Sequence, residues 1–565
     1  MSHKIIPIVV EGASKQRKRE APKGRRVDPA VLLEVQAMLG DASRQRDLLI
    51  EHLHVINDRF GHLPAPHLAA LAQEMRIPQS EVYEVATFYH HFEVVKEGED
   101  APPAITVRVC ESLSCEMAGS QDLLTRLPAI LGNNVRVIPA PCIGRCEDAP
   151  AVVVGQRQVP RATLESVKVI VDSGDFKHVP EAYIEYTEYN SKGGYQLLRD
   201  CVSGKRDIDS VFKSMEHSDL RGMGGAGFPA GRKWSIVKAE PGTRLMAVNI
   251  DEGEPGTFKD RYYLERDPHR FMEGMLIAAW AVGIDEIYIY LRDEYHGCRE
   301  LLEVELDKLR AEPPIAEMPT IHLRRGAGAY ICGEESAMIE SIEGKRGMPR
   351  LRPPYVAQVG LFGRPTLEHN FETLHWVREI LERGTAWFTS QGRHGSKGLR
   401  SFSVSGRVKS PGMKLAPSGI TVTELINEYC GGMQDGHSFY GYLPGGASGG
   451  ILPASMGDVP LDFGLLQAYD CFIGSAAVIV LSDKDTATEA ARNTMNFFKH
   501  ESCGQCTPCR EGTSKALDLI KKDQWDVRLL QDLSGVMRDA SICGLGQAAP
   551  NNFDCVIKYF PEELK

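Results

Sequence analysis

The sequence predicts an α/β protein built from several domains. Its 565 residues exceed the roughly 250–300 residues at which a single hydrophobic core stops growing. Hydrophobic residues make up 42% and charged residues 25% of the chain, which is typical of globular proteins and excludes a wholly disordered, collagen-like or coiled-coil chain. Predicted strands alternate with predicted helices in two separate parts of the chain, which is the pattern of α/β domains.

Composition also argues against two classes of protein. The formal net charge is −11, whereas a general nucleic-acid-binding protein is normally basic. The longest apolar runs, at 275–284 and 472–481, are shorter than the ~18 residues of a spanning helix, and the first residues lack the pattern of a secretory signal. We therefore expect a cytoplasmic chain without nucleic-acid or membrane partners, whose fourteen cysteines bind metal, take part in catalysis or are simply buried.

The predicted elements divide the chain into seven segments. Helical spacing of apolar residues dominates after residue 29, and two regions combine strands with helices: strands 105–109, 135–138 and 151–154 with helix 121–131, and strands 246–250, 286–291 and 321–324 with helix 271–282. Short strands at 402–404, 419–422, 439–443 and 476–480 precede a helical C-terminal part. The expected segments are a disordered basic arm (1–28), a helical domain (29–100), a small α/β domain (104–172), a polar linker (173–194), a second α/β domain (195–397), a β domain (398–485) and a helical domain with cysteines (486–565).

The strongest motif is the run Cys503-Gly-Gln-Cys506-Thr-Pro-Cys509, with Cys543 further along the chain. Its C-x2-C-x2-C spacing matches the start of the bacterial ferredoxin pattern, in which thiolates hold a [4Fe-4S] cluster. Zinc is the alternative, but zinc sites usually use two separated cysteine pairs. We predict a [4Fe-4S] cluster on these four cysteines, ahead of zinc and of chance clustering.

A second cysteine set consists of two short pairs, Cys110 with Cys115 and Cys142 with Cys146. Each pair follows a predicted strand. Two pairs of thiolates suit a [2Fe-2S] cluster, with one pair on each iron, or a tetrahedral zinc ion. The other predicted cluster favours iron–sulfur here, and a chain with two such centres is most simply an electron conductor.

The other cysteines, and two adjacent histidines, lack the spacing that is typical of a metal site. Six cysteines share no spacing, and we interpret most of them as small buried side chains: Cys201, Cys298, Cys332, Cys430, Cys471 and Cys555. His90 and His91 are adjacent in sequence and cannot share one helical face, so we interpret them as surface or packing residues.

Glycine-rich and acidic segments indicate a nucleotide site. The run from Gly222 to Gly227 satisfies G-x-G-x-x-G, but a helix and not a strand is predicted before it, so the dinucleotide-binding context is missing. Glycines can still let backbone N–H groups approach a phosphate, and Lys233 follows closely. Asp251, Glu252 and Glu254 end a predicted strand, where they form a solvated loop or bind ribose or ribityl hydroxyls.

A third segment, 326–335, ends in Glu334 and Glu335. These acids also suit the start of a helix, because a carboxylate interacts favourably with the helix dipole there. Cationic residues follow at 345–346 and at 350–352.

These motifs together resemble a known family. Segments 221–229, 249–261, 326–335, 343–355 and 501–512 resemble the flavin-bearing NADH-oxidising subunit of respiratory NADH:quinone oxidoreductase. Segment 83–89 and the cysteines from Cys110 to Cys146 resemble the neighbouring [2Fe-2S] subunit, whose cluster domain is thioredoxin-like. Both parts in one chain look like a diaphorase subunit, most similar to the β subunit of NAD-dependent molybdenum or tungsten formate dehydrogenase.

The resemblance implies a fold for each domain and a role for individual residues. It implies a thioredoxin-like [2Fe-2S] domain, a Rossmann-like FMN/NAD domain, a β-grasp insert and a C-terminal helical bundle with the [4Fe-4S] cluster. Glu252, Glu254 and Glu335 would line the nicotinamide side of NAD(H) and are the candidate catalytic residues, and Phe228, Tyr355 and Arg352 would flank the adenine. FMN would be bound by Gly222, Gly224, Gly225, Gly227, Lys233, Asn249, Asp251, Asn370 and Thr373. One departure is His369, which stands before Asn370 where the family often has asparagine.

The implied chemistry needs both kinds of cofactor. NAD exchanges two electrons as hydride, iron–sulfur clusters pass one electron at a time, and a flavin does both, so FMN must lie between them. We expect a separate catalytic subunit, with a molybdenum or tungsten pterin and further Fe–S clusters, to oxidise formate and deliver electrons through the cluster of Cys503, Cys506, Cys509 and Cys543. The alternatives are a diaphorase of an NAD-reducing hydrogenase or of NADH:quinone oxidoreductase and, from another class, a zinc-stabilised scaffold.

Overall fold

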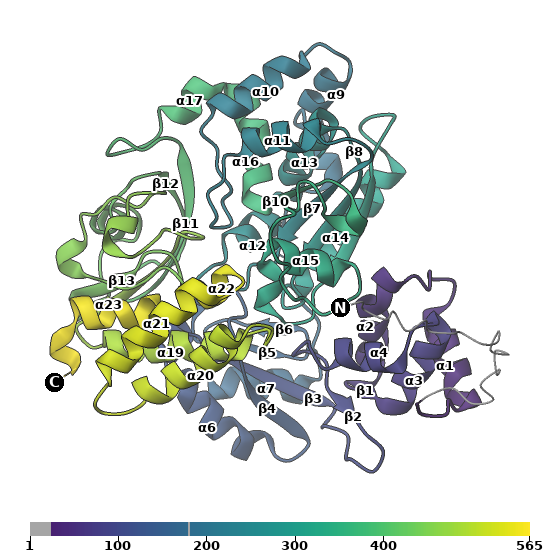
Figure 1. Ribbon diagram of the computed structural model, residues 1–565, viewed down its shortest axis with the longest axis horizontal. Coiled ribbons are helices and arrows are strands. Elements are labelled where there is room, and N and C mark those ends of the chain that lie inside the picture. Colours follow the sequence, from purple (N-terminus) through teal and green to yellow (C-terminus); the bar gives the residue numbers. More distant parts are fainter. Residues whose placement is uncertain (1–23, 179–180, 565) are drawn as a thin grey trace, which may run out of the picture.

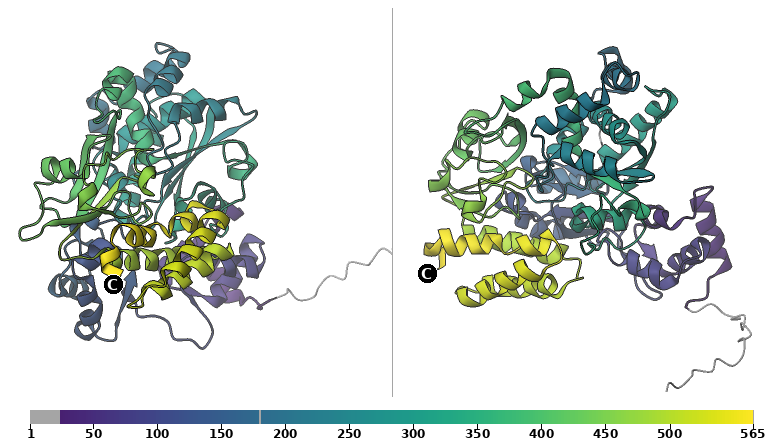
Figure 2. Two further views of the ribbon diagram at one scale, coloured as in Figure 1. Left: turned by 60° about the vertical axis from the view of Figure 1, so that its left-hand side comes forward. Right: turned by 45° about the horizontal axis from the view of Figure 1, so that its top comes forward.

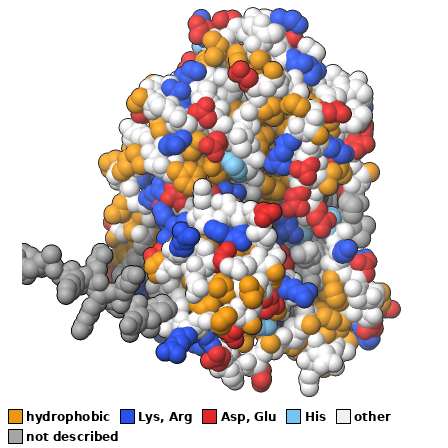
Figure 3. All heavy atoms as spheres, turned by 90° about the vertical axis from the view of Figure 1, so that its right-hand side faces the viewer, with side chains coloured by type: hydrophobic (Ala, Val, Ile, Leu, Met, Phe, Trp, Pro, Cys, Tyr) orange, Lys and Arg blue, Asp and Glu red, His pale blue; other side chains and the backbone are white. Residues whose placement is uncertain are grey.

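The computed structural model describes residues 24–178 and 181–564, so most of the predicted basic arm lies outside the described residues. The elements form several groups that pack against one another (Figures 1 and 2). Within the described ranges, no helix is both long enough and apolar enough to cross a membrane. On the face drawn in Figure 3, acidic and basic side chains are interspersed and no broad basic surface is visible.

The first group is helical. Its helices are α1 (Pro29–Leu39), α2 (Leu49–Phe60), α3 (Ala65–Met75) and α4 (Gln79–Ala86). Asp28 begins α1 by accepting the backbone N–H of Ala30 at 2.8 Å, as expected of an N-cap residue. Val35, Leu53 and Ile56 are buried, as their helical spacing predicts.

The second group is a four-stranded sheet with helices packed against it, and it carries the first cysteine set. Its strands β3 (Ile105–Cys110), β4 (Val135–Ala140), β5 (Val152–Val154) and β6 (Arg157–Val159) lie in the order β4-β3-β5-β6. β3 pairs with β4 in parallel and with β5 antiparallel, and α6 (Ser120–Leu131) packs against α7 (Leu164–Ser173). The strands and the helix predicted here are therefore found.

The predicted linker at 173–194 is more ordered than expected. It contains α8 (Tyr186–Ser191), in which Tyr186 and Tyr189 are buried. Tyr189 donates its hydroxyl to Glu273 at 2.6 Å, and the backbone N–H of Tyr186 donates to Glu305 at 3.0 Å. Both partners lie far along the chain, so the local polar composition did not reveal this helix.

The central group is a parallel sheet with helices on both faces. Its strands, β7 (Arg244–Ile250), β8 (Ile284–Leu291), β9 (Thr320–Arg325) and β10 (Thr366–Asn370), lie in the order β10-β7-β8-β9. Met246 and Val248 pack on the side of α13 (Pro268–Val282) and α16 (Phe371–Arg383), whereas Ala247 packs on the side of α15 (Glu335–Ile342). Burial on both faces explains the apolar runs that predicted β7 and β8, whereas β10, with the sequence Thr-Leu-Glu-His-Asn, was not predicted.

The fourth group is a mixed five-stranded sheet. Its strands β11 (Leu399–Gly406), β12 (Gly412–Pro417), β13 (Phe439–Leu443), β14 (Leu452–Pro453) and β15 (Ala477–Ser482) lie in the order β12-β11-β15-β13-β14. The strand predicted at 419–422 is wrong. Thr421 instead begins the short helix α18 (Val422–Glu424), and Thr421 and Glu424 form a reciprocal capping box, a local start signal that outweighs the β-branched composition.

The last group is helical and carries the second cysteine set. It consists of α19 (Ala487–Glu501), α20 (Thr507–Ile520), α21 (Val527–Ala540), α22 (Gly544–Ala548) and α23 (Asn551–Tyr559). α19 packs against both α20 and α23, and α20 packs against α21. Figure 1 shows this group beside the mixed sheet and next to the cysteine-bearing sheet of the second group.

Candidate functional site

The glycine loop lies between α10 (Ile208–His217) and α11 (Ala230–Ala239) and closes on the N-terminus of α16. The backbone N–H of Met223 donates to Oγ1 of Thr373 at 2.9 Å. A Cβ added to Gly224 would lie 3.1 Å from Cβ of Asn370, and Gly225 has a φ of +122°. Glycine is favoured at Gly224 by this close approach and at Gly225 by its positive φ.

Side chains at the carboxyl ends of β7 and β10 complete this region. Asn249 donates to the carbonyl of Gly333 at 2.9 Å, and Asn370 donates to Asp260 at 2.7 Å. Lys233 Nζ lies 2.9 Å from the carbonyl oxygen of Glu368. The residues predicted to bind FMN therefore gather at the strand ends where open parallel sheets bind ligands.

Asp251 has the clearest unsatisfied group of this region. Its Oδ2 is buried, and within the described residues it has no hydrogen-bond partner. Burial raises the pKa of its carboxyl well above the ordinary range. A buried acceptor without a partner fits a bound group that brings hydroxyl donors, as the ribityl chain of FMN would.

The candidate catalytic glutamates differ in environment. Glu252 is buried and accepts hydrogen bonds from the backbone of Asp260 at 2.8 Å and from the Tyr295 hydroxyl at 2.9 Å, and burial raises its pKa to about 7. Its carboxylate therefore has hydrogen-bond partners within the protein, and its expected place on the nicotinamide side stays a prediction. Glu254 accepts from the Tyr330 hydroxyl at 2.7 Å and from the backbone of Ser448 at 2.8 Å, and burial raises its pKa.

The remaining predicted contacts to NAD(H) lie near the start of α15 or at the surface. Glu335 opens α15 and pairs with Arg352 at 2.9 Å, while Glu334 caps the helix, as its alternative interpretation predicted. Phe228 and Tyr355 expose 38% and 55% of their surface. Large exposed aromatic rings are available for stacking on a planar ligand.

The first cysteine set converges in one buried pocket. Cys110 ends β3 and Cys115 lies in α5 (Leu113–Met117). Cys142 lies in the loop after β4, and Cys146 begins the 3-10 helix η2 (Cys146–Asp148) that follows this loop. The Sγ atoms of Cys142 and Cys146 are 3.4 Å apart, and the thiol of Cys110 has Cys115 and Cys142 as hydrogen-bonding neighbours, which raise its pKa. Four buried thiols from two pairs fit the ligand set of a [2Fe-2S] cluster.

The second cysteine set converges at the ends of three helices. Cys503 and Cys506 lie between α19 and α20, Cys509 lies in α20, and Cys543 caps α22. A Cβ on Gly546 would lie 2.8 Å from Cβ of Cys509, so α22 sits directly against α20. Burial raises the pKa of Cys509 to about 11 and that of Cys543 to about 12. Metal must displace these thiol protons, because only the thiolate is a ligand.

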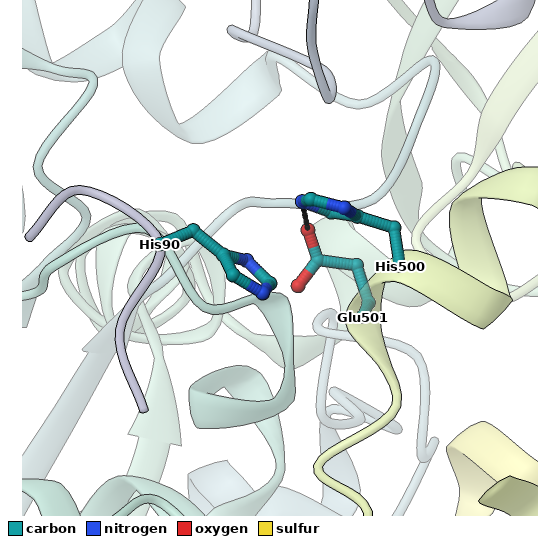
Figure 4. Close-up of side chains that lie close together, drawn as sticks. All are labelled: His90, His500 and Glu501. Atoms are coloured by element: carbon teal, nitrogen blue, oxygen red, sulfur yellow. Dashed lines mark ion pairs between the residues drawn. The ribbon is translucent and has the colours of Figure 1, made fainter. Parts of the chain in front are cut away.

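Two side-chain groups were not found from the sequence. Cys471 and Cys555, interpreted as unrelated buried residues, bring their Sγ atoms within 3.6 Å of each other. His90, His500 and Glu501 place their ligand-type atoms within 4.8 Å of one another (Figure 4), although the sequence alone indicates that His90 is a surface or packing residue. Desolvation and the neighbouring His500 lower the pKa of His90 to about 4, so its imidazole is neutral. Neither group has a local spacing signal, because its members come from distant segments.

Helix α19 connects the two cysteine sets. Asn493 of α19 donates to the carbonyl of Glu111 at 2.7 Å, and Glu111 directly follows the cysteine ligand candidate Cys110. At the other end of α19, Glu501 lies two residues before Cys503 and accepts a hydrogen bond from the backbone N–H of Tyr330 at 2.9 Å. Since Tyr330 also donates to Glu254, the loop after β7 and the loop of Cys503 share one hydrogen-bonded contact.

Comparison with known proteins covers the chain in three parts. Residues 35–175 match the family model described as thioredoxin-like [2Fe-2S] ferredoxin, residues 215–379 match the Nuo51 FMN-binding domain, and residues 489–565 match the NADH-ubiquinone oxidoreductase-F iron-sulfur binding region. These matches confirm the predicted fold class, and they confirm FMN, NAD(H), a [2Fe-2S] cluster and a [4Fe-4S] cluster as cofactors.

Individual proteins are similar over long stretches. An NADH-quinone oxidoreductase subunit of Rhizobium meliloti is 40% identical over 400 residues, covering 68% of this chain and 94% of that protein. The mitochondrial NADH dehydrogenase [ubiquinone] flavoprotein 1 of Dictyostelium discoideum is 41% identical over 395 residues, covering 66% and 82%. A chain of NAD+-reducing [NiFe]-hydrogenase in the H2-reduced state is 30% identical, with a TM-score of 0.80 and coverage of 92% of both chains.

Proposed function

The chain belongs to the family of NADH-oxidising subunits that carry flavin and iron–sulfur clusters, and from this premise we propose that it is the diaphorase subunit of an NAD-dependent formate dehydrogenase. The observation that supports the diaphorase role is the connection of the loop after β7 to the loop of Cys503 through Tyr330. FMN, when bound, exchanges hydride with NAD(H) and single electrons with clusters. The zinc-stabilised scaffold finds no support in the family's cofactors.

In this proposal, different residues bind different parts of FMN and NAD(H). The loop from Gly222 to Gly227 admits the phosphate of FMN close to the backbone, and Asp251 accepts from ribityl hydroxyls. Phe228 and Tyr355 stack on the adenine, and Arg352 adds a positive charge near it. Tyr330 and Ser448 hold Glu254 in one orientation, so this carboxylate is the stronger candidate for the nicotinamide side, whereas Glu252 supports the fold of the loop.

Formate as the electron donor rests on the resemblance of the fused chain to formate dehydrogenase β subunits. The expected partner is a catalytic subunit with a molybdenum or tungsten pterin and further clusters. Hydrogen is the second candidate, because a chain of an NAD+-reducing hydrogenase is similar over 92% of both chains. A quinone-reducing module is the third, because the curated relatives are quinone oxidoreductase subunits.

The test is to purify the chain anaerobically with its native partners and to record the visible spectrum after adding formate without NAD. We expect the flavin and cluster bands to bleach, since electrons from formate would accumulate in this chain. Hydrogen is added to a parallel sample, and NADH to a third. Bleaching by NADH but not by formate would overturn the formate assignment, and bleaching by hydrogen would select the second candidate.

A further inference from the structure

Two buried guanidinium groups hold the loop of Cys142 and Cys146. Arg292 directly follows β8, and its side chain is 4% exposed. Its Nη2 donates to the carbonyl of Cys142 at 2.6 Å, and its Nη1 donates to the carbonyl of Glu252 at 2.6 Å. Arg261, whose side chain is 2% exposed, donates its Nε to the carbonyl of Gly144 at 2.9 Å. Both arginines belong to the flavin domain, although the loop belongs to the [2Fe-2S] domain.

We propose that Arg292 is a positioning residue that sets the reduction potential of the [2Fe-2S] cluster. One-electron reduction adds a negative charge to the cluster, so a nearby cation stabilises the reduced state. The effect is large in a buried site, because charges interact more strongly at low dielectric. Glu294 partly offsets this cation, since its Oε1 lies 2.9 Å from Nη2 of Arg292 in a site where Glu294 is only 10% exposed.

The same contacts orient the peptide groups of the loop. The carbonyls of Cys142, Ile143 and Gly144 accept from Arg292, Gln158 and Arg261, with Gln158 the longest at 3.5 Å. In a trans peptide group, the carbonyl of one residue and the N–H of the next point in opposite directions. A hydrogen bond that fixes the carbonyl therefore also fixes the direction of the N–H of the following residue. The backbone N–H of Gly144, in the peptide group whose Ile143 carbonyl Gln158 holds, donates to Sγ of Cys142 at 3.4 Å. Hydrogen bonds to cluster sulfurs are one of the factors that set its potential.

The contact also joins the two cofactor regions. Through Nη1, Arg292 holds the carbonyl of Glu252 in the loop that carries Asp251 and Glu254. The Tyr295 ring packs against Gly144, where a Cβ would overlap it, and its hydroxyl donates to Glu252 at 2.9 Å. Charge and hydrogen bonds from the flavin side thus reach the cluster loop directly.

The test is a redox titration of the purified holoprotein, with dithionite and mediators, that follows the EPR signal of the reduced [2Fe-2S] cluster. We expect R292Q to make the midpoint potential more negative, because it removes the cation and leaves Glu294 unpaired. A tenfold change in the reduction equilibrium is the size we expect, which corresponds to about 59 mV for one electron. E294Q should shift the potential in the opposite direction, because it removes the anion and leaves Arg292.

R126Q is the matched control. It removes the same type of charge from the [2Fe-2S] domain itself, but Arg126 is 58% exposed on α6, where solvent screens it, so the potential should stay at the wild-type value. An R292Q potential equal to that of R126Q, or an E294Q shift in the same direction as R292Q, would overturn the proposal.

If R292Q does not assemble its cluster, the variants R292K and E294Q test the proposal instead. The potential of R292K should stay close to that of the wild type, and an unshifted potential in E294Q would refute the role of Arg292. No electron donor enzyme is needed, so the outcome is independent of the formate assignment.

Discussion

At the scale of single residues, hydrogen-bond partners separate acids that look equivalent in the sequence. Asp251 leaves Oδ2 without a partner among the described residues, and an unsatisfied buried acceptor costs about 1–3 kcal/mol. Glu252, its neighbour, is satisfied by Asp260, Arg261 and Tyr295. Asp251 is therefore free to accept from a ligand. The acidic loop was predictable from its position after a strand, but its partners come from other segments, so the division of roles was not.

Gly224 offers a test of the flavin site at this scale. We expect G224A to weaken FMN binding by roughly tenfold, because its Cβ would lie 3.1 Å from Asn370 and overpacking of this kind costs about 1–3 kcal/mol. Titration of the apoprotein with FMN, followed by flavin fluorescence, measures the affinity.

G535A is the matched control for this substitution. Gly535 lies in α21, and apart from its chain neighbours and the backbone of its own helix no described atom lies within 4 Å of its would-be Cβ. The control should keep full FMN affinity and gain about 0.5–1 kcal/mol of stability, because alanine is favoured in helices. Equal FMN affinity in G224A and G535A would show that the glycine loop does not bind the flavin.

At the scale of elements, the accuracy of prediction follows the range of the contacts that stabilise each element. β7 and β8 were predictable because a strand that is buried on both faces has a continuous run of apolar residues in its sequence. The strand expected at 419–422 does not form, because Thr421 and Glu424 make a local capping box that begins a helix. This signal is present in the sequence. Helix α8 could not be predicted in this way, because Glu273 and Glu305 stabilise it from distant helices.

His54 makes the docking of α2 onto the parallel sheet sensitive to pH. Its Nε2 lies 2.8 Å from the carbonyl oxygen of Gly326, and burial lowers its pKa to about 3. Below the ordinary histidine pKa of about 6.5, the unfolded chain binds a proton that the folded chain does not. Stability therefore falls as the pH drops from 6.5 towards 3, by about 1.4 kcal/mol per pH unit.

The variant H54Q isolates this contribution. Its amide does not titrate, so the loss of Tm between pH 7 and pH 5.5 should be smaller than in the wild type. Comparing the two proteins is necessary because Glu51, whose pKa is raised to about 7 by burial, favours folding as the pH falls. Parallel pH profiles of Tm for both proteins would contradict the assignment to His54.

At the scale of the whole molecule, function depends on contacts between domains that are far apart in sequence. The cysteine spacings predicted both clusters, because the first set consists of two short pairs and the second has three of its four cysteines in the run from Cys503 to Cys509. The contact of Arg292 with Cys142 and the meeting of His90 with His500 have no such spacing, since they arise only when whole domains dock. The sequence therefore predicted the cofactors better than the connections between them.

The [4Fe-4S] cluster is the expected link between the flavin and a partner protein, and C506S tests this link. The substitution removes one of four ligands, whereas the residues assigned to FMN lie at the ends of β7 and β10 and in the glycine loop. We expect C506S to retain FMN and NADH-driven reduction of ferricyanide, but to lose donor-driven reduction of NAD+ in the assembled complex. C430A, which alters a buried cysteine outside both sets, should keep both activities. Donor-driven NAD+ reduction at the wild-type rate in C506S would show that electrons reach the flavin by another route.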